Sequence, residues 1–277
     1  MIHLAVMGNP IAHSRSPLLH QYFAKSAGID VHYEKQLVAL GEIESSITAF
    51  FQNGGKGCNI TLPFKQDVYT FLNPKLTDRA LLSGSVNTVF IQDNALYGDN
   101  TDGVGLVNDI KRQLGKTGLS GQRILIIGAG GATRGVIPSL LDEGITHLHI
   151  ANRTVSKAAS LIDYFSQHLE KWASKPTLSF SAINDAPPCD IIINASSSSL
   201  SQEALPLNPE VLQKASFAYD MLYTREGRTA FLDQCSCPKS DGLGMLIYQG
   251  LEAFSIWTGL HPSIHYAELE QLLRMDG

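Results

Sequence analysis

Short runs of β-branched and other apolar residues alternate with longer amphipathic segments over most of the chain. The short runs predict strands and the longer segments predict helices. Their alternation is typical of α/β units built around a mainly parallel sheet. Strands are predicted at residues 3–7, 31–38, 57–60, 86–91, 123–127, 147–151, 191–194 and 217–220. Helices are predicted at residues 17–27, 42–52, 104–113, 132–142, 155–168 and 245–258.

The pattern divides the chain into two α/β domains. At 277 residues, the chain is longer than one typical core supports. Residues 104–241 contain a glycine-rich turn between a strand and a helix and are predicted to form a Rossmann-type nucleotide-binding domain. The last helices, at 242–277, have no strand partner in their own segment. We expect them to complete an N-terminal α/β substrate domain at 1–103, with the active cleft between the two domains.

Composition and charge exclude several classes of protein. Hydrophobic residues make up 44% and charged residues 17% of the chain, as in a compact globular protein. A net charge of −5 gives no broad attraction to nucleic acid or to an anionic membrane. No apolar run approaches the roughly 18 to 20 residues of a membrane span. The first residues carry no basic leader, so no signal peptide is expected.

Cysteine usage favours a reducing compartment. The four cysteines are too few and too scattered for a disulfide framework, which predicts the cytoplasm. Cys235 and Cys237 could be half of a metal site, but no second Cys or His pair lies at finger-like spacing. We therefore expect two surface thiols there and no metal site.

The stretch "RILIIGAGGATRG" predicts a dinucleotide turn. A buried strand leads into glycines at 128, 130 and 131, with Ala129 between them and Ala132 after them. Glycines there let the backbone approach a pyrophosphate, which the free N–H groups of a helix N-terminus can bind. The match to G-x-G-x-x-G is imperfect, because Thr133 takes the sixth position. A βα turn with packing glycines is the alternative.

The end of the next predicted strand favours NADP over NAD. An NAD site usually places an acidic residue about 20 residues after the first glycine, on the ribose 2′-hydroxyl. Here that place holds neutral Asn152, followed by Arg153, Thr154 and then Lys157. A guanidinium can bind a 2′-phosphate through two hydrogen bonds, whereas a carboxylate would repel it. Thr154 could instead be an ordinary helix cap beside a surface arginine.

The stretch "GNPIAHSRSP" places two hydroxyls before a helix. Ser16 precedes a proline at the first helical position, where serine commonly caps a helix. Ser14 has no such role, and hydroxyls with unpaired N–H groups at a positive helix end suit a small carboxylate. His13 and His20 are expected to be packing or surface histidines.

Two further polar stretches contain a candidate acid/base pair. "GGKGCNITLPFKQ" is no phosphate loop, because its lysine follows Pro-Phe rather than Gly. Pro63 is predicted to begin a helix with Lys65 in its first turn. In "GDNTDGVGL", Asp102 could cap a helix. Alternatively, Asp102 meets Lys65 and orients it as the proton donor that a carbonyl needs when it receives a hydride.

Together these stretches resemble one family, the biosynthetic, NADP-dependent shikimate dehydrogenases. The resemblance covers essentially the whole chain through "GNPIAHSRSP", "GGKGCNITLPFK", "SGSVNTV", "GDNTDGVG", "GAGGATRG", "NRTVSK", "YDMLY" and "DGLGMLIYQG", in the family's order. It implies reversible reduction of the C3 carbonyl of 3-dehydroshikimate by NADPH. The implied partner is thus a small-molecule substrate, and the expected state is a monomer or homodimer.

The resemblance also implies roles for individual residues. It makes Lys65 the catalytic lysine and Asp102 its partner. Substrate contacts are implied for Ser14, Ser16, Asn59, Thr61, Asn87, Tyr223 and Gln249. Cofactor contacts are implied for Gly128, Ala129, Gly130, Gly131, Ala132, Asn152, Arg153, Thr154, Lys157, Met221 and Gly242.

The chain departs from the family at two places. Ser196 and Ser199 stand where relatives usually have Thr and often Gly, beside the expected nicotinamide. Lys157 stands where many relatives have Arg, which keeps the charge but loses the fork geometry. Two rival hypotheses remain: a quinate/shikimate dehydrogenase that tolerates NAD, and a non-catalytic NADPH sensor on the same fold.

Overall fold

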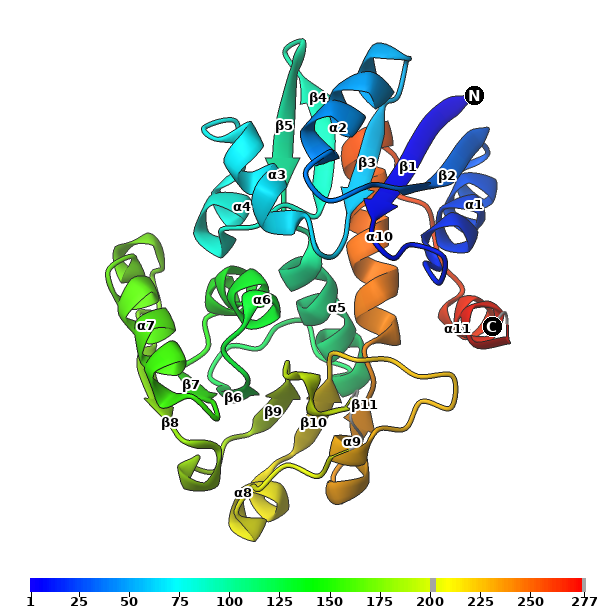
Figure 1. The fold of residues 1–277 in the computed structure, drawn as a ribbon. Coiled ribbons are helices and arrows are strands. Elements are labelled where there is room, and N and C mark those ends of the chain that lie inside the picture. Colours follow the sequence, from blue (N-terminus) through cyan, green and yellow to red (C-terminus); the bar gives the residue numbers. More distant parts are fainter. Residues whose placement is uncertain (200–202, 276–277) are drawn as a thin grey trace. The chain divides into compact units, whose positions relative to one another are not determined.

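The computed structural model describes residues 1–199 and 203–275, and the backbone but not the side chain of Ser199. The low-complexity stretch at 196–202 therefore lies partly outside the described residues. The chain divides into two compact units (Figure 1). The first comprises Met1–Gly105 and Leu246–Gly277, and the second Leu106–Met245.

The first unit is built on a five-stranded mixed sheet in the order β2-β1-β3-β4-β5. The strands β2, β1 and β3 are parallel, and β4 and β5 run antiparallel to their neighbours. Alternate side chains of a strand point to opposite faces, and both faces are covered by helices. The strands are β1 (Ile2–Gly8), β2 (Val31–Leu37), β3 (Gly57–Ile60), β4 (Thr88–Gln92) and β5 (Ala95–Asp99).

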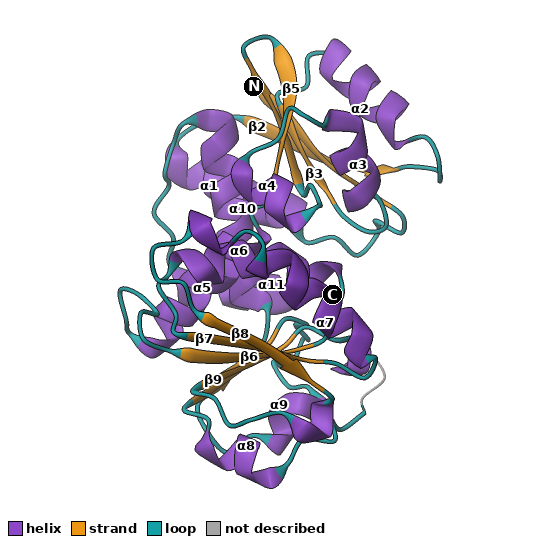
Figure 2. Cartoon of the chain, turned by 90° about the vertical axis from the view of Figure 1, so that its left-hand side faces the viewer, coloured by secondary structure: helices purple, strands orange, loops and turns teal. Residues whose placement is uncertain are grey.

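Helices cover this sheet on both sides (Figure 2). α2 and α3 pack on one face around a buried cluster that includes Met7, Ile47 and Phe64. α1 and α10 lie on the other face, where Trp257 of α10 donates its indole N–H to the Val89 carbonyl of β4. The helices that lie wholly or partly in this unit are α1 (Ser16–Ala27), α2 (Ile43–Gln52), α3 (Lys65–Leu72), α4 (Asp78–Ser83), α5 (Asp102–Leu114), α10 (Leu243–Thr258) and α11 (Tyr266–Met275).

The second unit is a Rossmann-like layered domain. Its six strands are parallel in the order β11-β10-β9-β6-β7-β8. Figure 2 shows this sheet between α6 and α7 on one side and α8 and α9 on the other. The strands are β6 (Arg123–Ile127), β7 (His147–Ala151), β8 (Thr177–Ser181), β9 (Ile191–Asn194), β10 (Phe217–Asp220) and β11 (Lys239–Ser240). The helices are α6 (Gly131–Asp142), α7 (Val155–Ser166), α8 (Pro209–Lys214) and α9 (Ala230–Gln234), with short 3-10 turns η1 (Leu169–Lys171), η2 (Ile183–Asp185) and η3 (Ser197–Ser199).

The glycines around β3 serve a turn and close packing of the core. Gly54 has φ +92° and forms a turn. A Cβ on Gly55 would lie 2.3 Å from the Phe50 ring, and one on Gly57 would lie 2.2 Å from Trp257. Both positions therefore need glycine because an aromatic side chain occupies the space of a Cβ.

Two local predictions are wrong. The helix after Pro63 begins at Lys65, with Phe64 at its N-cap. Cys235 is buried rather than a surface thiol, and Cys237 is half-buried. Burial raises the pKa of the Cys235 thiol to about 12, because a low-dielectric environment disfavours the thiolate.

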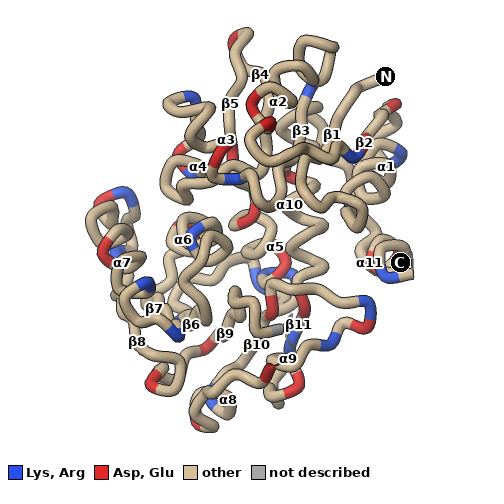
Figure 3. The backbone as a smooth tube through the Cα atoms, viewed as in Figure 1, with Lys and Arg blue, Asp and Glu red and all other residues tan. Residues whose placement is uncertain are grey.

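Among the described residues, no helix combines the length and the apolar character needed to cross a membrane. Basic and acidic residues are interspersed along both units (Figure 3).

Candidate active site

Lys65 and Asp102 meet in the first unit. The Nζ atom of Lys65, at the start of α3, lies 2.6 Å from Oδ2 of Asp102, at the start of α5. Their side chains are 26% and 16% exposed, so the pair is partly shielded from water. Because the Asp102 carboxylate is turned toward Lys65, the pair interpretation replaces that of a simple helix cap.

Asn87 holds the other oxygen of this carboxylate. Its Nδ2 donates to Asp102 Oδ1 at 2.8 Å and lies 3.4 Å from Gln249 Oε1 on α10. Its Oδ1 accepts the backbone N–H of Thr101 at 2.9 Å. Asn87 is 2% exposed. It therefore fixes the orientation of Asp102 relative to the neighbouring chain segments.

A second network, missed by the sequence analysis, fixes the backbone of Asp102. Asn100 accepts the Asp102 N–H at 3.0 Å, and Asp99 accepts the Asn100 N–H at 2.7 Å. Arg79 binds both oxygens of Asp99, at 2.7 and 2.6 Å, and also Glu252 of α10 at 2.9 Å. Asp99, the first acid of "GDNTDG", was the feature of the sequence that could have indicated this network. Its partner Arg79 is distant in sequence.

The two serines lie at the start of α1, where Ser14, but not Ser16, lines a cavity of about 280 Å³. Ser16 is the first residue of the helix, and Arg15, not Ser16, occupies the N-cap without a side-chain cap bond. The predicted cap is therefore wrong. Ser14 does have a local role, because its hydroxyl accepts the Ser16 N–H at 3.3 Å.

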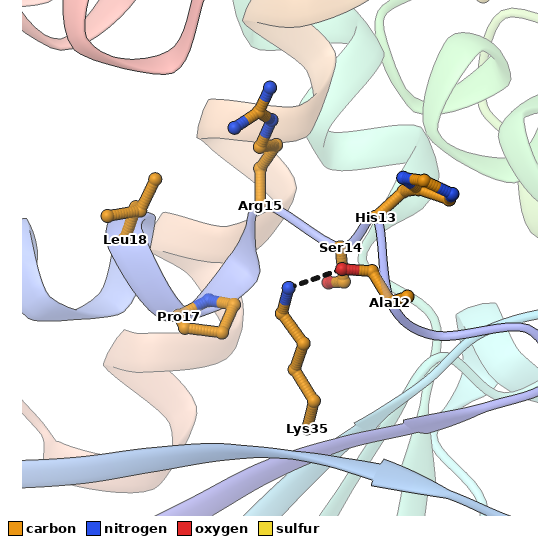
Figure 4. Close-up of a pocket in the computed structure, with 7 residues that line it drawn as sticks. All are labelled: Ala12, His13, Ser14, Arg15, Pro17, Leu18 and Lys35. Atoms are coloured by element: carbon orange, nitrogen blue, oxygen red, sulfur yellow. Dashed lines mark hydrogen bonds between the residues drawn. The ribbon is translucent and has the colours of Figure 1, made fainter. Parts of the chain in front are cut away.

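The same cavity is lined by basic groups that the sequence analysis did not assign to a site. Figure 4 shows Lys35 reaching from β2 to the Ala12 carbonyl, at 2.6 Å. The side chains of Arg15 and His13 point away from this carbonyl. His13 is exposed, as expected for a surface histidine. Cations beside a serine hydroxyl suit an anionic group.

Both polar atoms of the Asn59 side chain make hydrogen bonds within the protein. Its Oδ1 accepts the hydroxyl of Tyr33 at 2.7 Å, and its Nδ2 donates to the Asn87 carbonyl at 3.2 Å. Asn59 is only 6% exposed. Thr61, two residues later, is half-buried, and its hydroxyl makes no hydrogen bond within the described residues.

His20 is a packing histidine, as expected. Its ring stacks on Tyr33 with 4.4 Å between centroids and is fully buried. Its nitrogens make no well-formed hydrogen bond within the described chain, although nearby Asn59 offsets part of the effect of burial. Burial lowers the pKa of His20 from 6.5 to about 3, so the ring is neutral in the folded protein.

This depressed pKa predicts a loss of stability in acid. The unfolded chain takes up a proton at His20 below pH 6.5, whereas the folded chain does so only near pH 3. The contribution of His20 to the free energy of unfolding is therefore present above pH 6.5 and is lost as the pH falls below that value. Between pH 7 and pH 5 the loss is about 2 kcal/mol. Urea unfolding of wild type and His20→Phe should show a shallower acid slope in the variant. Equal slopes would contradict the lowered pKa assigned to His20. His149, whose pKa is lowered to about 4, contributes equally to the acid slopes of both proteins.

The second unit contains a pocket at the glycine turn. Gly128 has φ +111°, and its N–H donates to the Ala151 carbonyl at 2.8 Å. Gly130 caps α6, and a Cβ on Gly130 or Gly131 would meet no atom within 4 Å. This open space allows the close approach of a phosphate group to the helix N-terminus.

Thr133 explains the imperfect glycine motif. It is fully buried, and its hydroxyl donates to the Gly128 carbonyl at 2.9 Å. The third glycine of such turns serves close packing of helix and strand. Here a buried hydroxyl binds the turn to the helix instead.

The pocket has a volume of about 730 Å³ and gathers most of the predicted cofactor residues. Asn152 donates its amide N–H to the Thr154 carbonyl at 2.8 Å. Thr154 occupies the N-cap of α7, as the alternative interpretation expects, but makes no side-chain cap bond. The predicted residues along its lining are Gly128, Ala129, Gly130, Gly131, Ala132, Asn152, Arg153, Thr154 and Lys157.

The remaining predicted cofactor residues, Met221 and Gly242, follow strands β10 and β11. A Cβ on Gly242 would lie 2.2 Å from the Met221 carbonyl oxygen, so these two residues are in contact but do not line the pocket. Tyr223 follows in the same segment and is half-buried. Ser196, where relatives usually have Thr, donates its hydroxyl to Asn194 at 2.7 Å, so the hydroxyl remains engaged.

Comparison with known proteins places these features in one family. Residues 6–89 match the shikimate dehydrogenase substrate binding domain, 110–206 the shikimate / quinate 5-dehydrogenase domain, and 242–268 the shikimate 5'-dehydrogenase C-terminal domain. The chain belongs to the shikimate dehydrogenase family. It is an oxidoreductase of the NADP-dependent type, as the sequence predicted.

Individual relatives agree over nearly the full length. The chain is 43% identical over 262 residues to shikimate dehydrogenase (NADP(+)) of Chromobacterium violaceum, covering 93% of each chain. The structure of shikimate 5-dehydrogenase from Thermus thermophilus with NADP(H) and shikimate has a TM-score of 0.83 at 29% identity, covering 99% of each chain. The ligand-free 5-ketofructose reductase of Gluconobacter sp. strain CHM43 has a TM-score of 0.86 at 28% identity, covering 99% of this chain and 98% of that one. The fold alone therefore does not select the substrate.

Proposed function

We propose that the chain interconverts 3-dehydroshikimate and shikimate with NADP, and that Lys65 and Asp102 are its catalytic residues. The 2.6 Å contact between Lys65 Nζ and Asp102 Oδ2 carries the proposal. Reduction of a carbonyl needs a cationic or acidic group at the oxygen on which negative charge develops. The names of the curated relatives support this substrate over the sugar substrate of the Gluconobacter neighbour.

The surrounding residues prepare the ammonium of Lys65. Bound NADPH supplies the hydride. Within the described residues, the ammonium makes one side-chain hydrogen bond, to Asp102, so two of its three N–H groups are available to the carbonyl oxygen of the substrate. Asn87 prevents Asp102 from turning away. Lys65 then donates the proton that completes the new hydroxyl or stabilises the alkoxide until another donor does so.

Substrate binding is assigned mainly to the first unit. Ser14, which lines the basic cavity, and Ser16, two residues later, are proposed to bind the carboxylate of shikimate. The unengaged hydroxyl of Thr61, together with the amide of Gln249, fits the ring hydroxyls, and Asn87 acts on their surroundings because its amide binds Asp102 and Thr101. Asn59 acts on their surroundings, because its own polar atoms are engaged. Tyr223, in the second unit, is proposed as a further contact.

Cofactor binding is assigned to the second unit. Gly128 to Ala132 face the pyrophosphate, and Arg153 with Lys157 faces the 2′-phosphate. Both side chains are exposed at the pocket rim and can turn toward an anion. Met221 and Gly242 are proposed to lie near the nicotinamide. No acidic side chain occupies position 152, which favours NADP.

The ratio of kcat/KM values for shikimate and quinate, each with NADP and NAD, tests this specificity. We expect shikimate with NADP to be preferred. Equal use of NAD, or of quinate, would favour the broader quinate/shikimate enzyme. We further propose a cytoplasmic enzyme that acts as a monomer or homodimer and does not bind nucleic acid.

A further inference from the structure

A cluster of metal-binding side chains lies on the first unit, away from the proposed active site. His3 on β1 and His32 and Glu34 on β2 each offer one ligand atom, and these three atoms all lie within 4.8 Å of one another. His3 Nε2 is 3.5 Å from one Glu34 oxygen, and His32 Nε2 is 3.8 Å from the other. The cluster was not predicted from the sequence, because the two histidines are 29 positions apart.

The strand register creates the cluster. His3 is paired directly with His32 on the parallel neighbour, and Ala5 is paired with Glu34. Residues two apart on a strand share a face, so all three ligands point to the same side. The small side chain of Ala5 leaves room for Glu34 to lean toward His3. On this face the His3 ring packs 5.2 Å from that of Phe50 on α2.

Two observations favour a metal over a simple ion pair. His3 Nε2 is buried and has no hydrogen-bond partner within the described residues, and a buried polar atom without a partner is costly. The side-chain amide of Gln36 donates a hydrogen bond to Glu34 Oε1 at 2.5 Å. Hydrogen bonds of this kind, from residues that do not touch the metal, orient the carboxylates that do.

We propose that His3, His32 and Glu34 bind one divalent transition-metal ion of the zinc type. Two imidazoles and a carboxylate suit Zn²⁺ or Co²⁺ better than Mg²⁺ or Ca²⁺, which prefer oxygen ligands. Bonds of about 2.0–2.2 Å in a tetrahedron separate ligand atoms by about 3.4 Å. The observed 3.5 and 3.8 Å are close to that value, and His32, with a side chain 53% exposed, is free to complete the approach.

The site ties the edge strand β2 to β1 at the amino-terminal ends of the strands. Lys65 follows the carboxyl-terminal end of β3. The ion therefore serves the stability of the sheet rather than the reaction, and its loss should leave turnover unchanged. The fourth coordination position is left to water.

Titration of tag-free, chelator-treated protein with Zn²⁺ and with Co²⁺ tests the proposal. Co²⁺ adds a visible spectrum that reports tetrahedral nitrogen and oxygen ligation without a thiolate band. We expect one saturable equivalent per chain and a higher Tm with Zn²⁺.

Three variants decide whether the assigned residues hold the ion. His32→Ala and Glu34→Gln should each weaken binding about 10-fold or more, since even outer partners of a metal ligand contribute that much. His261→Ala, which removes an exposed histidine elsewhere in the same unit, should bind as wild type does. Unchanged shikimate turnover in all three confirms that they fold. Absence of saturable binding, or wild-type affinity in either site variant, would overturn the proposal.

Discussion

Replacing Lys65 with alanine is expected to lower kcat by about 10²- to 10⁴-fold, the range that a positioned proton donor contributes. The KM for shikimate should change far less, because the proposed serine, threonine and amide contacts remain. Steady-state kinetics of shikimate oxidation by wild type and Lys65→Ala measures both quantities. Lys56→Ala, which removes an exposed lysine nine positions earlier, is the matched control and should keep wild-type kcat.

The Lys65→Arg variant separates the two roles of the ammonium. Arginine keeps the positive charge but does not release a proton in proteins. If Lys65 donates the proton, this variant should be as inactive as Lys65→Ala. If Lys65 mainly stabilises the alkoxide, a substantial part of kcat should return. Wild-type turnover in Lys65→Ala would show that the chemistry lies elsewhere.

Replacing Arg153 with alanine is expected to lower kcat/KM for NADP about 10- to 100-fold while leaving that for NAD nearly unchanged. The estimate follows from the roughly 1.5–3 kcal/mol of a hydrogen bond to a charged group. NAD lacks the 2′-phosphate, so it loses nothing. The ratio of the two kcat/KM values therefore reports this single contact.

Two further variants control that experiment. Arg228→Ala removes another exposed arginine of the second unit, one that pairs with Asp233 at 3.2 Å, and should leave both cofactors unaffected. Lys157→Arg restores the fork found in many relatives and should raise NADP affinity if Lys157 also faces the phosphate. An equal loss for NADP and NAD in Arg153→Ala would exclude the proposed phosphate contact.

Local sequence predicted the bounds of four strands of the second sheet correctly. The strands at 123–127, 147–151, 191–194 and 217–220 coincide with β6, β7, β9 and β10, because strands buried on both faces form continuous apolar runs. β5 was missed because Ala, Gly and Asp are poor strand formers. β8 was missed because this edge strand is half exposed and carries serines.

Local sequence did not establish contacts between distant segments, and the meeting of Lys65 with Asp102 was one of two open alternatives, favoured by the family resemblance. Lys65 and Asp102 are 37 positions apart, and only the pairing of β3 with β4 and of β4 with β5 brings them together. Gly57 faces Trp257, 200 positions later. The His3, His32 and Glu34 cluster likewise depends on the register of β1 and β2. Motifs identified Lys65 and Asp102, whereas the strand pairing brings them together and alone reveals the other contacts.

The most direct test of the central claim is the formation of reduced nicotinamide when the protein is mixed with shikimate and NADP. We predict a rise in absorbance of the reduced cofactor with wild type and with Lys56→Ala, and a rate at least about 100-fold lower with Lys65→Ala. No absorbance change at high wild-type concentration would contradict the catalytic account and favour a non-catalytic NADPH sensor.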